Sequence, residues 1–257
     1  MKNLQSYGLI GYPLSHSFSK KYFTEKFEKE KLKDHEYNLF PIEQIEELPE
    51  LIAKHPQLKG LNVTIPYKES VIPFLTELDA TAAEIGAVNC IKIIPDGSQK
   101  KLIGYNTDAF GFRQSIKPFL ESHHEKALIL GTGGASKAVH YVLTTIGIDC
   151  YFVTRTKIID NQLVQKKEFS YEELNEYVMN AFKLIVNTTP VGMYPNVTDS
   201  PAIPYEYITP QHLLYDLVYN PLETAFLKKG KQAGASTVNG LSMLHQQAEE
   251  AWMIWNQ

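Results

Sequence analysis

A glycine-rich turn at residues 130–136 is the segment whose residue types point most directly to chemistry. It reads LGTGGAS, directly after the apolar run Ala127–Leu130 and before a stretch with helical spacing. Backbone N–H groups at such a strand-to-helix turn can bind a pyrophosphate, and the helix dipole favours its negative charge. Gly131 permits the tight turn and Gly133 the close approach of the phosphate, while Ser136 replaces the third glycine of the fingerprint.

We therefore predict a dinucleotide site at this turn, against the alternative of a plain strand-to-helix connection. The predicted cofactor-binding residues of the turn are Gly131, Thr132, Gly133, Gly134, Ala135 and Ser136.

The end of the next predicted strand indicates which dinucleotide is bound. NAD-specific domains place a carboxylate there, about 20 residues beyond the glycines. Asp149 has roughly this spacing but lies at the start of the strand, whereas the strand ends in Thr154, Arg155 and Thr156. A guanidinium and a hydroxyl suit the 2′-phosphate of NADP, which a carboxylate would repel. The pattern favours NADP over NAD, and the alternative is that Arg155 is a solvated surface charge.

Polar side chains also follow a predicted strand in the first hundred residues. Gly60–Lys68 reads GLNVTIPYK, and Asn62 and Thr64 share one face of that strand. Ligands in open α/β sheets bind beyond the carboxyl ends of strands, so this is the expected edge for a substrate. Lys68 is the strongest candidate for a proton carrier, against the alternative of an ordinary surface lysine.

Two serines leave the first predicted strand. Ser17 and Ser19 belong to the segment Gly11–Ser19, which reads GYPLSHSFS. Their hydroxyls could hydrogen-bond a carboxylate or ring hydroxyls, or either serine could cap the following helix.

Amides and a carboxylate occur further along the same half of the chain. Asn89 enters the fourth predicted strand, and Asn106–Asp108 lies at the expected junction of two domains. The Asp108 carboxylate could pair with Lys68 and orient it, whereas capping of the next helix by Asn106 or Asp108 is the alternative.

Short apolar runs that alternate with helical stretches must position these groups. In the first half we expect a helix at Ser19–Lys31 and strands at Tyr7–Gly11, Glu36–Phe40, Gly60–Ile65 and Ala87–Ile94. In the second half we expect strands at Ala127–Leu130, Cys150–Thr154, Phe182–Val186 and His212–Leu217, and a helix after Gly240.

This alternation predicts an α/β fold with two domains. Residues 1–107 and 239–257 should form a substrate-binding, catalytic domain with a mainly parallel sheet. Residues 108–238 should form a Rossmann-like, doubly wound domain that binds NADP.

Composition and charge exclude several classes of function. The 257 residues are 44% hydrophobic, which suffices for one or two cores, and the net charge of −4 offers no basic surface for nucleic acid. No run is long enough to span a bilayer and no signal peptide is visible, so we expect a cytoplasmic protein. Cys90 and Cys150 lack metal-ligand spacing, so we expect buried reduced thiols rather than a redox pair or a metal site.

Taken together, these segments resemble the shikimate dehydrogenase family, in order along almost the whole chain. The first matching pieces are GYPLSHSFS at Gly11–Ser19, GLNVTIPYK at Gly60–Lys68, GAVN at Gly86–Asn89, NTD at Asn106–Asp108 and GTGGAS at Gly131–Ser136. They continue with TRT at Thr154–Thr156, NTTPVGM at Asn187–Met193, YDLVYNP at Tyr215–Pro221 and NGLSMLHQQA at Asn239–Ala248. The resemblance implies reversible, NADPH-dependent reduction of 3-dehydroshikimate to shikimate, a step of chorismate and aromatic amino acid biosynthesis.

The resemblance also implies a role for each matching residue. Lys68 would be the catalytic lysine and Asp108 its acidic partner, and which of the two carries the proton in each direction stays open. Ser17 and Ser19 would hold the substrate carboxylate. The ring hydroxyls would be bound by Asn62, Thr64, Asn89, Asp108 and Gln247, with Tyr219 also contacting substrate. Asn187, Thr188, Leu217 and Gly240 would line the cofactor and nicotinamide site.

Some positions depart from the family, and some alternatives remain. Tyr12 stands where asparagine is usual, Lys20 where proline is usual, and Asp160 near the second basic residue of the NADP clamp. A dehydrogenase acting on quinate or on both acids with NAD is one alternative, although the serine pair leaves little room for quinate's extra hydroxyl. A non-catalytic dinucleotide-binding regulator is another, and a folate-linked dehydrogenase should show a lysine–tyrosine arrangement that is not visible here. We expect a small-molecule substrate, no nucleic-acid, membrane or metal partner, and a monomer or homodimer.

Overall fold

A computed structural model describes residues 4–14, 17–97, 99–155 and 167–257. The chain divides into two compact units, Met1–Thr107 with Ala248–Gln257 (unit 1) and Asp108–Gln247 (unit 2). The first boundary between the two units lies after residue 107. The return to unit 1 lies at 247/248, inside the last helix α8 (Leu241–Asn256), rather than at residue 239. The reason is that α8 is continuous, and its early turns pack within unit 2 while its last turns pack within unit 1.

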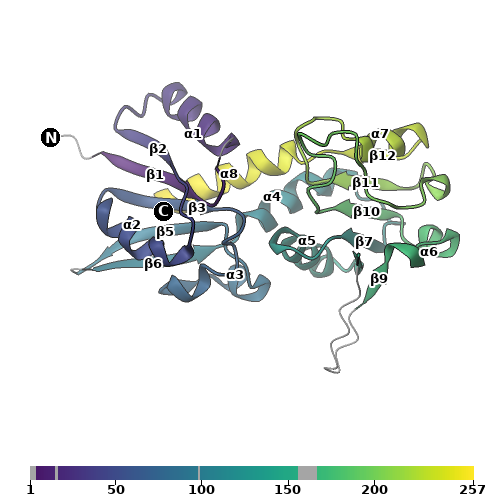
Figure 1. Cartoon of the computed structure of the whole chain (residues 1–257), viewed down its shortest axis with the longest axis horizontal. Helices are drawn as coiled ribbons and strands as arrows, with labels where there is room; N and C mark the ends of the chain where they lie inside the picture. Colours follow the sequence, from purple (N-terminus) through teal and green to yellow (C-terminus); the bar gives the residue numbers. More distant parts are fainter. Residues whose placement is uncertain (1–3, 15–16, 98, 156–166) are drawn as a thin grey trace. The chain divides into compact units, whose positions relative to one another are not determined.

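Unit 1 is built on a six-stranded sheet in the order β2-β1-β3-β5-β6-β4 (Figure 1). The strands are β1 (Gln5–Ile10), β2 (His35–Phe40), β3 (Leu58–Val63), β4 (Glu77–Leu78), β5 (Cys90–Asp96) and β6 (Gln99–Tyr105). β1 pairs in parallel with β2 and β3, whereas β5 runs antiparallel to β3 and β6. The expected strand at Ala87–Ile94 corresponds to β5, whereas the sequence does not predict β6, because the polar start of β6 lacks an apolar strand pattern.

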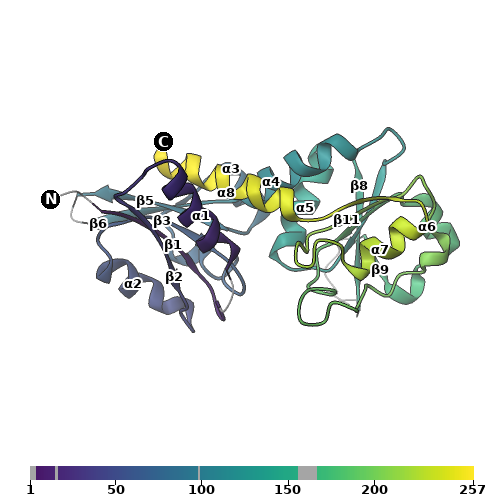
Figure 2. The ribbon, with the colours of Figure 1, turned by 90° about the horizontal axis from the view of Figure 1, so that it is seen from above.

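Helices cover both faces of this sheet, with α1 (Phe18–Lys29) and the end of α8 on one face and α2 (Leu48–Lys54) on the other (Figure 2). The remaining helical segments are α3 (Ala80–Ile85) and the 3-10 turns Ile45–Glu47 and Ile72–Phe74. The α1 side is an aromatic core that includes Tyr7, Phe23, Tyr37 and Trp255. α1 ends at Lys29, before the Lys31 of the expected helix, because Lys31 adopts a left-handed φ of 58°.

The end of α8 is held against the sheet at Gly60. A Cβ at Gly60 would lie 2.2 Å from Nε1 of Trp255, and that indole nitrogen donates to the Ile91 carbonyl at 3.0 Å. Trp255 is buried, so a glycine is required where its ring crosses β3.

We therefore expect Gly60→Ala to lower the free energy of unfolding of unit 1 by about 1–3 kcal/mol through overpacking. The measurement is denaturant unfolding followed by tryptophan fluorescence, which reports on unit 1 because Trp252 and Trp255 both lie there. Gly133→Ala is the control, since its Cβ would meet open space. An unchanged midpoint for Gly60→Ala would contradict this account of the α8 contact.

Unit 2 has a six-stranded, all-parallel sheet in the order β12-β11-β10-β7-β8-β9. The strands are β7 (Lys126–Leu130), β8 (Asp149–Thr154), β9 (Glu168–Ser170), β10 (Leu184–Asn187), β11 (Leu213–Asp216) and β12 (Ser236–Val238). The helices are α4 (Thr107–Ile116), α5 (Gly134–Thr145), α6 (Glu176–Ala181), α7 (Ala225–Gln232) and the first turns of α8, with 3-10 turns at Lys117–Phe119, Tyr171–Glu173 and Tyr205–Tyr207. The chain starts with β7 in the middle of the sheet and adds β8 and β9 on one side of it. It then returns to the middle and adds β10, β11 and β12 on the other side of β7. This is the doubly wound dinucleotide-binding order, so the predicted fold class is confirmed.

The cysteines, the membrane-spanning potential and the metal-ligating groups can be read from the same structure. Cys90 and Cys150 are buried free thiols, as predicted, and burial raises the pKa of Cys150 to about 12. In the described ranges, no helix has the length and apolar character needed to cross a membrane. The same ranges contain no group of three His, Cys, Asp or Glu side chains placed to hold a metal ion.

Candidate functional site

Ser17 and Ser19 lie at the start of α1 in unit 1. The Ser17 side chain caps α1 by accepting a hydrogen bond from the Lys20 backbone N–H at 3.3 Å, so the capping role expected for one of the serines is present. Capping uses Ser17 as an acceptor, and its hydroxyl hydrogen is still able to point to an anion.

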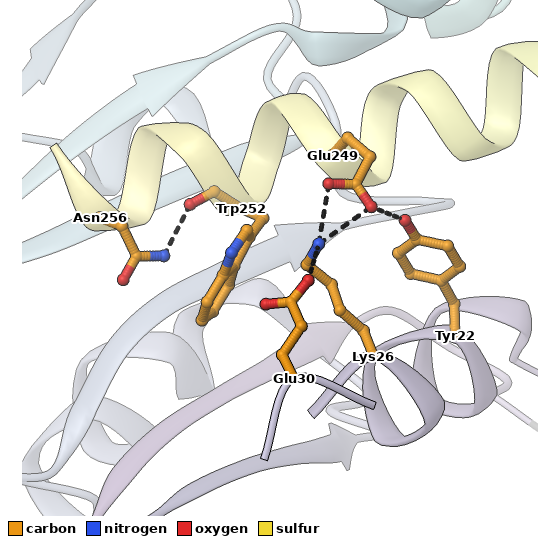
Figure 3. A network of polar contacts seen from close by, with 6 residues as sticks. All are labelled: Tyr22, Lys26, Glu30, Glu249, Trp252 and Asn256. Carbon is orange, nitrogen blue, oxygen red and sulfur yellow. Dashed lines mark hydrogen bonds and ion pairs between the residues drawn. The ribbon is translucent and has the colours of Figure 1, made fainter. Parts of the chain in front are cut away.

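Helix α1 is fixed to α8 by a polar network (Figure 3). Lys26 forms ion pairs with Glu249 on α8 at 2.9 Å and with Glu30, the C-cap of α1, at 2.8 Å, and Tyr22 donates to the same Glu249 carboxylate. The Lys26 ammonium also lies 5.9 Å from the centre of the Trp252 ring. These contacts hold the helix that carries Ser17 and Ser19 in place.

The carboxyl end of β3 carries Asn62 and is followed by Thr64 and Lys68. The Thr64 backbone N–H donates to the Ile10 carbonyl at 3.0 Å, which places Thr64 beside the end of β1. One turn later, the Lys68 carbonyl accepts from the Val88 N–H at 2.7 Å, next to Asn89. Asn62, Thr64 and Lys68 are all half-buried, so their side chains combine fixed positions with access to a ligand.

Asn89 connects this edge to the segment before α4. Its Oδ1 accepts from the Thr107 backbone N–H at 2.6 Å, and its backbone carbonyl accepts from Asn62 Nδ2 at 3.4 Å. Asn106 Nδ2 donates to the Ala87 carbonyl at 2.9 Å. These bonds fix the chain immediately before Asp108, a buried residue at the start of unit 2.

The glycine turn in unit 2 has the geometry of a phosphate cradle. Gly131 has a φ of +102°, and a Cβ there would lie 2.8 Å from Thr189 Cγ2. Gly133 is the N-cap of α5, and a Cβ there would project into open space. Ser136 is buried and its hydroxyl donates to the Gly133 carbonyl at 2.6 Å, so a small residue does pack at this position. The turn therefore fits a pyrophosphate at the start of a twelve-residue helix.

The loops after β10 and β11 are organised around a buried carboxylate, Asp216. It accepts hydrogen bonds from Asn187 Nδ2 at 2.9 Å, the Val218 N–H at 3.0 Å and the Thr224 hydroxyl at 2.6 Å. Burial raises the pKa of Asp216 to about 6, against these three bonds, which lower it. Asn187 is itself fully buried, and its amide nitrogen is held by the Asp216 carboxylate.

The backbone at Gly240 lies unusually close to the backbone at Leu217. A Cβ on Gly240 would lie 2.0 Å from the Leu217 carbonyl oxygen, so only glycine permits this approach. Thr188, which follows β10, is held by a hydrogen bond from its hydroxyl to the Leu130 carbonyl at the end of β7, at 2.6 Å. The positions predicted for the nicotinamide site, Thr188, Leu217 and Gly240, thus belong to one rigid group of loops in unit 2.

The end of β8 carries the groups predicted to select NADP. Thr154 is buried and Arg155 is exposed, while Asp149 lies at the opposite end of β8 and pairs with Lys167. Burial raises the pKa of Tyr171 while the nearby Arg155 charge lowers it, so Tyr171 borders the same position. Thr156 and Asp160 lie outside the described residues.

Comparison with known proteins decides the family. The sequence profile described as "Shikimate dehydrogenase substrate binding domain" matches residues 9–91. Shikimate dehydrogenase (NADP(+)) of Carboxydothermus hydrogenoformans is 41% identical over 96% of this chain and 90% of its own. The chain belongs to the shikimate dehydrogenase family.

Solved structures of shikimate dehydrogenases have the same fold. The chorismate mutase/shikimate 5-dehydrogenase fusion protein of Clostridium acetobutylicum superposes with a TM-score of 0.85 at 37% identity, over 99% of this chain and 92% of that one. The Thermus thermophilus shikimate 5-dehydrogenase, solved with NADP(H) and shikimate, gives a TM-score of 0.80 at 30% identity over 98% and 93% of the two chains.

For this shikimate dehydrogenase family member, the structure groups the predicted residues by unit. Unit 1 contains Ser17, Ser19, Asn62, Thr64, Lys68 and Asn89. Unit 2 contains Asp108, the glycine turn, Thr154, Arg155, Asn187, Thr188, Leu217, Tyr219, Gly240 and Gln247. Asp108 and Gln247 belong to α4 and α8, which cross closely because Gly111 has no side chain: a Cβ there would lie 2.6 Å from the Met243 carbonyl.

Sequence reasoning missed two buried polar residues, Tyr37 and Asp216. Each contacts a predicted site residue from a distant part of the chain: Tyr37 contacts Asn62, and Asp216 contacts Asn187. Asp216 lies within the matched piece at Tyr215–Pro221, and its position at the carboxyl end of a strand was the available signal.

Proposed function

We propose that this protein catalyses the reversible, NADP-dependent reduction of 3-dehydroshikimate to shikimate. The observation that carries the proposal is the 41% identity, over 96% of this chain, with a relative named shikimate dehydrogenase (NADP(+)). The phosphate cradle at Gly133 and the polar edge around Lys68 are the two features through which the chain would perform this reaction.

Substrate would bind at the carboxyl ends of β1 and β3. The hydroxyls of Ser17 and Ser19 would donate to its carboxylate, and the ring hydroxyls would meet Asn62, Thr64 and Asn89, together with Tyr219 and Gln247. Neutral donors suit an anion in this position because they are already fixed by the capping bond and the strand-end bonds described above.

Proton transfer would be the work of Lys68 and Asp108. NADPH held by the glycine turn and Arg155 would supply a hydride to the ring ketone carbon. The Lys68 ammonium would give a proton to the carbonyl oxygen as that oxygen gains negative charge, which would leave a secondary alcohol and a neutral amine. Asp108 would orient Lys68 toward the substrate oxygen. In the direction of shikimate oxidation the amine would accept the same proton.

Cofactor choice would depend on Arg155. Arg155→Ala should raise the KM for NADP⁺ roughly tenfold or more, because a charge-assisted bond to the 2′-phosphate is lost. The KM for NAD⁺ should change less than twofold. The control is Lys167→Ala, which removes a cation paired with Asp149 at the opposite end of β8. Equal rises for both dinucleotides in Arg155→Ala would argue against this role.

A steady-state assay tests the proposed function. The protein is given shikimate or quinate, each with NADP⁺ or NAD⁺, at alkaline pH, and reduction of the dinucleotide is recorded. We expect kcat/KM to be highest for shikimate with NADP⁺. Highest activity with quinate or NAD⁺ would favour a quinate or dual-specificity dehydrogenase, and NADP⁺ binding without turnover of either acid would favour a regulator.

We also propose that the protein acts in the cytoplasm as a monomer or homodimer. The absence of a suitable spanning helix among the described residues is compatible with this placement. Light scattering on the purified full chain measures the oligomeric state, and a mass of a trimer or larger would contradict the proposal.

A further inference from the structure

Tyr37 is a buried phenol on β2 that no part of the mechanism above uses. It lies opposite Tyr7 of β1 in the parallel register and stacks on Phe23 at 4.7 Å. Its hydroxyl donates to Asn62 Oδ1 at 2.8 Å. Burial raises the pKa of Tyr37 well above its usual range, against a hydrogen bond from Ser19 that lowers it. The Tyr37 oxygen therefore contacts two residues proposed to bind opposite ends of the substrate.

This contact determines which way the Asn62 amide faces. A neutral phenol has one hydrogen, and because it is given to Asn62, the amide oxygen must face Tyr37. The amide nitrogen then lies on the other side, where it donates to the Asn89 carbonyl at 3.4 Å. An amide nitrogen carries two hydrogens, so the orientation set by Tyr37 makes Asn62 a donor toward the site.

We propose that Tyr37 is a positioning residue for substrate recognition: it holds Asn62 as a hydrogen-bond donor to a ring hydroxyl oxygen of the substrate. The inference rests on the proposed function and deepens it, because it assigns the direction of one substrate contact and the residue that enforces it. The rigid setting favours this role, since Tyr37 is only 4% exposed and its ring is held by stacking.

Tyr37→Phe tests the inference with little change in packing. We expect the KM for shikimate to rise roughly 5- to 20-fold, since a buried amide loses the bond that fixes its orientation. The KM for NADP⁺ should stay within about twofold and kcat within about threefold, because neither the cofactor site nor proton transfer is touched. Tyr7→Phe is the matched control, which removes another buried hydroxyl of the same aromatic core, one bonded to Gln5.

A double-mutant cycle separates positioning from a general structural effect. Asn62→Ala should raise the KM for shikimate by itself, and adding Tyr37→Phe to Asn62→Ala should cause less than a twofold further change. A purely structural tyrosine would instead reduce stability and activity to the same extent in both backgrounds. Thermal unfolding of all four variants accompanies the kinetics.

Three results would overturn the inference. They are an unchanged KM for shikimate in Tyr37→Phe, an equal rise in Tyr7→Phe, and full additivity with Asn62→Ala. Failure of the proposed function is distinguishable, because it would be seen in the wild-type protein as absent turnover of shikimate with NADP⁺, and the inference would then fall with it.

Discussion

Replacing Lys68 with alanine is expected to lower kcat for shikimate oxidation at least a hundredfold while shikimate still binds. General acid–base assistance is worth roughly a hundredfold to ten-thousandfold, and the ammonium of Lys68 is the group proposed to supply it. The bound acid would keep its contacts with the hydroxyls and amides around β1 and β3, which alanine does not disturb. The measurements are steady-state kinetics and direct titration of shikimate into the variant.

Lys68→Arg is the control that separates charge from proton transfer. Arginine keeps the positive charge but holds its proton too tightly to exchange it at working pH. We expect Lys68→Arg to lose turnover nearly as severely as Lys68→Ala. Near-normal turnover in Lys68→Ala would remove Lys68 from the mechanism, and recovery in Lys68→Arg would reduce its role to electrostatics.

Replacing Gly133 with valine is expected to abolish NADP⁺ binding in a protein that remains folded. A Cβ at Gly133 meets no protein atom within 4 Å, and the residue has an ordinary extended backbone with φ −78° and ψ 179°. A valine there is therefore tolerated by the protein but would occupy the space assigned to the pyrophosphate. We expect the Kd for NADP⁺ to rise by roughly a hundredfold or more, measured by calorimetry.

Gly131→Ala serves as the comparison, because it is expected to destabilise the protein, whereas Gly133→Val is expected to leave it folded. Its φ of +102° and the approach of Thr189 make any side chain unfavourable, so we expect a lower thermal midpoint. The two glycines would thus separate, with Gly133 needed for the ligand and Gly131 needed for the turn itself. Normal NADP⁺ affinity in Gly133→Val would show that the phosphate binds elsewhere.

Local features of the site could be predicted from the sequence because their determinants are contiguous. The glycine turn, Arg155 at the end of β8 and Lys68 after β3 each depend on a strand and the few residues that follow it. In a parallel sheet the carboxyl ends of neighbouring strands share an edge, so the glycine turn after β7 and Arg155 after β8 could be inferred to lie at one edge of the unit 2 sheet.

Features that depend on distant partners could not be predicted in this way. The strand β6 joins the sheet through its pairing with β5, although its own pattern is polar, and α8 is divided between the units because Trp255 reaches β3 over Gly60. From the sequence, Tyr37 and Asp216 are indistinguishable from any other aromatic or acidic residue of a strand, because their roles depend on contacts with distant residues.

Sequence patterns alone predict the fold class, the glycine-rich turn and the set of candidate side chains, because short-range periodicity and turn chemistry depend on neighbouring residues. The folded chain shows how those side chains are held: which amide faces a phenol, which carboxylate is buried among three donors, and where a glycine lets two backbones touch. These features could not be predicted because hydrogen-bond direction and close packing are properties of pairs of residues, and the partners here are far apart along the chain. Asn62 lies 25 positions from Tyr37, and Asp216 lies 29 positions from Asn187.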